Sequence, residues 1–101
     1  MKMLLTVEMP HEPFTSLVRN GKVGEIIGHI LETIQPEAAY FTEHEGKRGA
    51  ILVVNVRTES DVPALAEPFF LNFQADCKFR ILMSPQDLQK SDLQALGKKW
   101  A

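Results

Sequence analysis

Few side chains in this chain of 101 residues could do acid–base chemistry near neutral pH. The imidazoles of His11, His29 and His44 titrate in that range. His29 falls in a helical pattern, whereas His11 and His44 stand at the ends of strand patterns. Neither His11 nor His44 has a ligand residue four positions away, so we expect no metal site. We take His11, His44 and Glu8 as the candidate catalytic groups, with ordinary surface histidines as the alternative.

A second set of side chains is suited to binding. Thr6, Tyr40 and Asn55 carry neutral hydrogen-bonding groups and alternate with apolar residues along predicted strands. Arg80 adds a cation. We expect the ligand-binding residues to be Thr6, Tyr40, Asn55 and Arg80. A mostly apolar surface with few polar groups is typical of a small-molecule site, and equally of a wet dimer interface.

Glu8 and Arg80 fall on one face of neighbouring strands if the strands lie in the order 4-1-3-2. One interpretation is a buried pair for acid–base chemistry or for anchoring an anion. The other is a cross-strand salt bridge that fixes the register of a dimer. The sequence leaves both open.

Cys77 is the only cysteine, which excludes an internal disulfide and a multi-cysteine metal site. It begins a strand pattern on the more apolar side, and nothing nearby in sequence would lower its pKa. We expect a buried structural thiol.

Two periodicities define the elements that would position these groups. Apolar residues alternate, as in strands, over residues 2–9, 38–44 and 77–83, whereas the strand predicted over 49–56 is apolar on both faces. Apolar residues recur at three- and four-residue spacing, as in an amphipathic helix, from Phe14 to Ile34. Glycines in the middle of that run leave open one helix or two pieces over 13–20 and 22–34, and a further helix is predicted over 62–73. Ser84 followed by Pro85 predicts the start of a helical C-terminal segment. The apolar residues of that segment are Leu88, Leu93, Leu96 and Trp100.

The segments between these elements carry local signals. The polar run at 45–49 contains two glycines and predicts a hairpin loop. Ser60 and Asp61 are candidate helix caps. Pro68 predicts a kink or a restarted turn within the helix over 62–73.

The order of elements predicts an α+β fold of the ferredoxin-like βαββαβ type. We expect one domain over 1–101, with a core at 2–83 and a C-terminal extension at 84–101. The helical regions over 13–34 and 62–73 would both cover one face of a four-stranded antiparallel sheet. The strand residues expected beneath them are Met3, Leu5, Val7 and Met9, then Ala50, Leu52, Val54 and Val56, then Cys77, Phe79, Ile81 and Met83.

The composition predicts a soluble, cytoplasmic protein. A net charge of −2 provides no basic field for nucleic acid or anionic lipid. No run approaches the roughly 20 apolar residues of a membrane span. The first ten residues lack the long apolar region of a signal peptide, so we expect none.

The second face of the predicted sheet is too apolar at its centre for water alone. Exposing Leu4, Ile51, Val53 and Leu82 together would cost several kcal/mol at about 25 cal/mol per Å². RNA, the chain's own tail or a second copy could cover this face. RNA-recognition domains share the topology, but the run 48–55 lacks every aromatic residue that would stack on bases. A second copy is the cover we expect.

The sequence resembles the dimeric α+β-barrel superfamily. The resemblance rests on the order of elements over 2–83, on an aromatic helix that ends in "EPFFLNF", and on the tail after "MSP". It is similar to the muconolactone isomerase-like and antibiotic-biosynthesis-monooxygenase-like branches. The resemblance implies a homodimer of paired sheets, with a pocket in each subunit and a tail that reaches across the dimer. It further implies isomerisation or oxygenation of a small organic molecule without a cofactor. The alternative is a non-enzymatic binding or assembly module.

Overall fold

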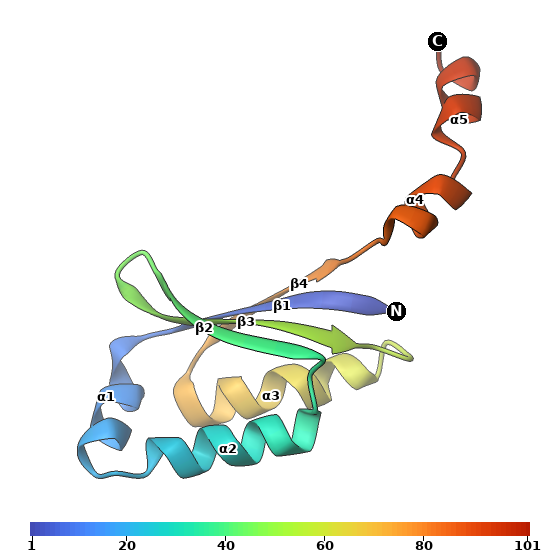
Figure 1. Ribbon diagram of the computed structural model, residues 1–101. Helices are drawn as coiled ribbons and strands as arrows, with labels where there is room; N and C mark the ends of the chain where they lie inside the picture. The colour runs from blue at the N-terminus through green and yellow to red at the C-terminus, as the bar shows by residue number, and fades with distance from the viewer.

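The computed structural model describes residues 1–101 and shows an α+β fold built on one four-stranded antiparallel sheet (Figure 1). In chain order, the elements are β1 (Lys2–Met9), α1 (His11–Arg19), α2 (Val23–Ile34), β2 (Ala38–His44), β3 (Lys47–Asn55), α3 (Asp61–Phe73), β4 (Asp76–Ile81), α4 (Pro85–Lys90) and α5 (Leu93–Lys99). The strands lie in the order β2-β3-β1-β4. This arrangement is compatible with the ferredoxin-like fold.

The core lies between the sheet and the helices α1, α2 and α3, which cover one face of the sheet (Figure 1). Every second residue of β1 and β3 points into it, because side chains alternate along a strand. The buried strand residues are Leu5, Val7, Met9, Ala50, Leu52 and Val54, as the sequence predicted. Phe73 of α3 meets Phe14 of α1, with 5.1 Å between their ring centroids.

Glycines decide two of the element boundaries. Gly21 has φ +75° and separates α1 from α2, which confirms two helical pieces in place of one. Glu45 and Gly46 both have positive φ and form a two-residue turn between β2 and β3. Such turns suit the twist of antiparallel strands, so the loop is shorter than the predicted 45–49.

Three local predictions need correction. The side chain of Ser60 makes no capping hydrogen bond; the carboxylate of Asp61 accepts the backbone N–H groups of Arg57 and Thr58. These two hydrogen bonds lower the pKa of Asp61. α3 is also continuous across Pro68.

The last predicted strand is too long. β4 pairs with β1 only as far as Ile81, and both Ile81 and Met83 are exposed. The chain leaves the sheet after Leu82, whose N–H donates to the carbonyl of Lys2. The alternation of apolar residues in the sequence continues beyond the part of β4 that the helices cover. The sequence therefore predicted a longer buried strand than the structure has.

The C-terminal segment projects away from the sheet as two short helices (Figure 1). The predicted helix start at Ser84 is confirmed, and Ser84 and Asp87 form a capping box at the start of α4. Every residue from Met83 to Ala101 is exposed. The radius of gyration is 17.2 Å, whereas a compact chain of this size has roughly 13 Å. The tail therefore does not cover the sheet of its own chain. None of the helices is both long and apolar enough to cross a lipid bilayer.

Candidate functional site

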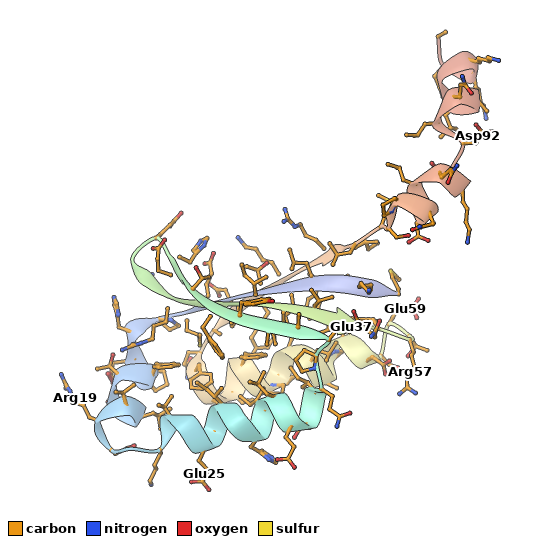
Figure 2. The ribbon with its side chains drawn as sticks, in the orientation of Figure 1. Arg19, Glu25, Glu37, Arg57, Glu59 and Asp92 are labelled. Atoms are coloured by element: carbon orange, nitrogen blue, oxygen red, sulfur yellow. The ribbon has the colours of Figure 1, made fainter.

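The open face is the side of the sheet that points away from α1, α2 and α3. Its members are Lys2, Leu4, Thr6, Glu8, Ala38, Tyr40, Thr42, His44, Lys47, Gly49, Ile51, Val53, Asn55, Asp76, Lys78 and Arg80. Side chains stand up from this face with no helix packed over them (Figure 2). Leu4 lies opposite Val53, and Ile51 lies opposite both Thr6 and Tyr40, so the centre of the face is largely apolar.

Two of the three candidate catalytic groups meet on the open face. The Nε2 atom of His44 on β2 contacts Oε1 of Glu8 on β1. These strands are not neighbours, because β3 lies between them. The pair crosses β3 at Gly49, which lies opposite both Glu8 and Thr42.

Gly49 makes this contact possible because it has no side chain. A Cβ at this position would lie 3.2 Å from the carbonyl oxygen of Val7 and 3.5 Å from Cβ of His44. A side chain at this position would therefore crowd the backbone of Val7 and the side chain of His44. Sequence reasoning did not find this role, although a glycine inside a strand often marks a close approach.

Lys78, and not Arg80, is the cation beside Glu8. The Nζ atom of Lys78 lies 3.9 Å from Oε1 of Glu8. Arg80 lies opposite Leu4, four residues along β1 from Glu8. The predicted pairing of Glu8 with Arg80 is therefore wrong, because the two residues share a face but not a register position.

The four predicted ligand-binding residues all lie on the open face but do not converge. Thr6 and Tyr40 flank Ile51 in one cross-strand row, and Arg80 belongs to the next row. Asn55 lies near the end of the face, where its side chain donates to Glu37 over 2.7 Å.

Glu37 is a residue that the sequence did not single out. Its carboxylate accepts the hydrogen bond from Asn55 and lies 3.0 Å from Nζ of Lys2. These contacts, with the Asn55 hydrogen bond first, hold the pKa of Glu37 below its ordinary value. The amide of Asn55 is thus already engaged by a neighbouring carboxylate.

His11, the third candidate catalytic residue, lies apart from this pair. It begins α1, and its carbonyl oxygen is 3.5 Å from Nη1 of Arg48. Arg48 is on the helix-facing side of β3, so His11 and the His44–Glu8 pair occupy opposite sides of the sheet. The structure therefore does not bring the three groups into one site.

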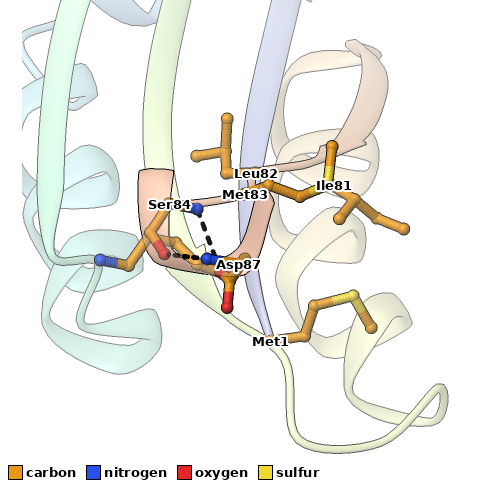
Figure 3. Close-up of a pocket in the computed structure, with 7 residues that line it drawn as sticks. Met1, Ile81, Leu82, Met83, Ser84 and Asp87 are labelled. Carbon is orange, nitrogen blue, oxygen red and sulfur yellow. Dashed lines mark hydrogen bonds between the residues drawn. The ribbon is translucent and has the colours of Figure 1, made fainter. Parts of the chain in front are cut away.

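Two of the surface cavities bear on ligand binding. The larger, of about 650 Å³, opens between the N-terminus and the start of the tail (Figure 3). Its polar side chains include Ser84 and Asp87, which already hydrogen-bond each other's backbone N–H. A second cavity, of about 360 Å³, lies between the sheet and α1 and α2.

Cys77 is half-buried beneath α3. Burial, and to a smaller extent the charge of Asp76, raises the pKa of its thiol to about 11. The thiol therefore stays protonated near neutral pH, in agreement with a structural role.

No protein-family model and no curated protein matches this sequence.

Proposed function

We propose that the protein is a homodimer in which two open faces pack against each other and enclose a site for a small organic molecule. In this proposal the paired sheets form a dimeric α+β barrel. The His44–Glu8 pair then lies inside the barrel and acts on the bound molecule without a cofactor. The uncovered open face is the observation that carries the proposal.

The open face provides only part of the area that a stable dimer needs. Four strands about 4.8 Å apart, each roughly 25 Å long, give a footprint of roughly 500 Å² per copy. A stable interface buries about 800 Å² on each partner. The sheet alone falls short of that area, and a further apolar surface is needed to reach it.

The C-terminal tail supplies such a surface. Its exposed apolar side chains are Leu88, Leu93, Leu96 and Trp100. They pack on nothing in their own chain, although α4 and α5 both have side-chain caps at their N-termini. An ordered helical segment with unpacked apolar residues is expected to bury them against a partner. We propose that the tail packs on the second copy.

The His44–Glu8 pair supplies a general base. The carboxylate of Glu8 orients the imidazole ring of His44 by accepting the N–H of Nε2. Nδ1 is then left to take a proton from a carbon acid and return it elsewhere on the molecule. Lys78, whose Nζ lies 3.9 Å from Oε1 of Glu8, carries the positive charge that would stabilise a developing enolate.

The alternative proposal is a non-enzymatic assembly module. One observation favours it: several polar groups of the open face already satisfy one another. Glu8 contacts His44 and Lys78, and Glu37 contacts Asn55 and Lys2. In a dimer without a ligand site, these polar groups need only be paired with one another when the interface buries them.

Native mass spectrometry of the purified protein separates these proposals. We expect a mass of twice the 11.4 kDa chain, with an additional small-molecule adduct. The adduct should be lost from a His44→Gln variant and retained by His29→Gln, which changes an exposed histidine on α2. A monomer at micromolar concentration would overturn the pairing. A dimer that carries no adduct would overturn the ligand site and leave the assembly module.

A further inference from the structure

The 360 Å³ cavity between the sheet and the helices is lined mainly from the helix-facing side of the sheet, and only Thr42 and Gly49 of the open face also border it. Met9, Phe14, Ile27 and Phe41 provide its apolar surface, and Arg48 is its only charged residue. It lies at the end of the sheet where α1 and the β2–β3 turn are found (Figure 1). Its volume falls within the range of small-ligand sites.

This end of the helical layer leaves an aromatic ring uncovered. Phe41 is on the helix-facing side of β2 by strand alternation, yet it is 55 % exposed. Gly24 of α2 also lines the cavity, and a Cβ there would meet no atom within 4 Å. The missing side chain on α2 therefore leaves room beside Phe41.

Arg48 is a half-buried cation with no carboxylate within ion-pair distance. Its Nη1 atom donates to Oγ1 of Thr15 over 3.0 Å, and its guanidinium carbon lies 4.5 Å from the centroid of the Phe14 ring. Nε and Nη2 make no hydrogen bond within the chain. That edge of a guanidinium has the geometry to donate two parallel hydrogen bonds to one carboxylate.

We propose that this cavity binds a small carboxylic acid with an apolar, preferably aromatic, body. The carboxylate accepts two hydrogen bonds from Nε and Nη2 of Arg48, and the body packs against Phe41, Ile27 and Met9. The binding neutralises a half-buried charge and covers exposed aromatic surface in one step. The site lies on the helical side of the sheet, so it does not depend on pairing of the open faces.

The test uses 2-naphthoate and its neutral analogue 2-naphthamide as probes, followed by amide NMR shifts of the full chain. We expect 2-naphthoate to shift the backbone amides of Phe14, Gly24 and Ile27 on the helices, and to bind at least tenfold more tightly than 2-naphthamide. Shifts centred on Tyr40 and Ile51 would place the molecule on the open face and overturn the proposal. Equal binding of the two probes, or no binding at millimolar concentration, would also overturn it.

Four variants test the contacts. Arg48→Met keeps packing volume against Phe14 and should weaken 2-naphthoate at least tenfold with little change for 2-naphthamide. Arg48→Lys keeps the positive charge but cannot donate two parallel hydrogen bonds to one carboxylate. It should therefore weaken the binding of 2-naphthoate less than Arg48→Met does. Gly24→Leu should fill the cavity and abolish binding of both probes. Gly28→Leu adds the same side chain to another exposed position of α2, outside the cavity lining, and should bind as the unchanged protein does. Equal effects of Gly24→Leu and Gly28→Leu on the binding of the probes would contradict the placement of the site in this cavity.

Discussion

Replacing Leu4 and Val53 together by glutamate should split the dimer without unfolding the chain. The two residues lie opposite each other on β1 and β3 and form part of the apolar centre of the open face. Both are only half-buried in the single chain, so a carboxylate at either position can remain in water when the chain is monomeric. In paired sheets the same carboxylates would be enclosed.

The magnitude follows from the area that pairing would bury. Full burial of a leucine or valine side chain contributes about 1.5–3 kcal/mol. Because Leu4 and Val53 are already half-buried in the single chain, pairing would add about 1 kcal/mol for each. Four side chains over two copies give about 4 kcal/mol, or roughly a thousandfold in the dissociation constant. The carboxylates of Val53→Glu have no cation opposite them and add several kcal/mol for each when they are enclosed, whereas those of Leu4→Glu lie opposite Arg80 and add less. No dimer should remain at micromolar concentration.

The matched control is the double change Val18→Glu and Leu71→Glu. These residues are 46 % and 78 % exposed on α1 and α3, away from the open face. The control removes the same residue types and adds the same two negative charges to the net charge of −2. We expect sedimentation velocity to show a monomer for the open-face variant and a dimer for the control. The reasoning fails if both variants dissociate, or if the open-face variant keeps its mass.

Three further predictions concern the single chain. Phe73→Ala should lower the free energy of unfolding by about 3–5 kcal/mol in urea, because Phe73 is 0 % exposed; Phe70→Ala, at 39 % exposure, should lower it clearly less, and equal losses would contradict the described core. Asn55→Ala should raise the pKa of Glu37 in an NMR titration, since the Asn55 amide is the main group that lowers it. Glu37 therefore stabilises the fold above its unfolded pKa and loses this effect as pH falls through the folded pKa; an unchanged pKa would refute the contact. Cys77 should react far more slowly with a thiol reagent at pH 8 in the folded protein than in urea, because its folded pKa is about 11; equal rates would refute its burial.

Strand positions were predictable because a period of two residues assigns each side chain to a face before any partner is known. The alternation in β1 and β3 placed Leu5 and Leu52 correctly beneath the helices. Register was not predictable in the same way. Knowing that Glu8 and Arg80 share a face does not say that they lie opposite each other, and the pairing with β4 separates them.

The His44–Glu8 contact was harder to foresee, since β3 lies between the two strands. Only Gly49 gave a signal, and its meaning depends on which residues flank it in the sheet. The tail shows a different limit. Its caps and apolar residues predict helices correctly, but they carry no information on which surface those helices cover.

Isotope-filtered NOE spectroscopy on a mixture of labelled and unlabelled chains tests the central claim most directly. The account predicts contacts between chains from the methyl groups of Leu4, Ile51 and Val53 to the Tyr40 ring. Contacts between chains from the tail residues alone, or none in a sample that sediments as a single 11.4 kDa chain, would contradict pairing of the open faces.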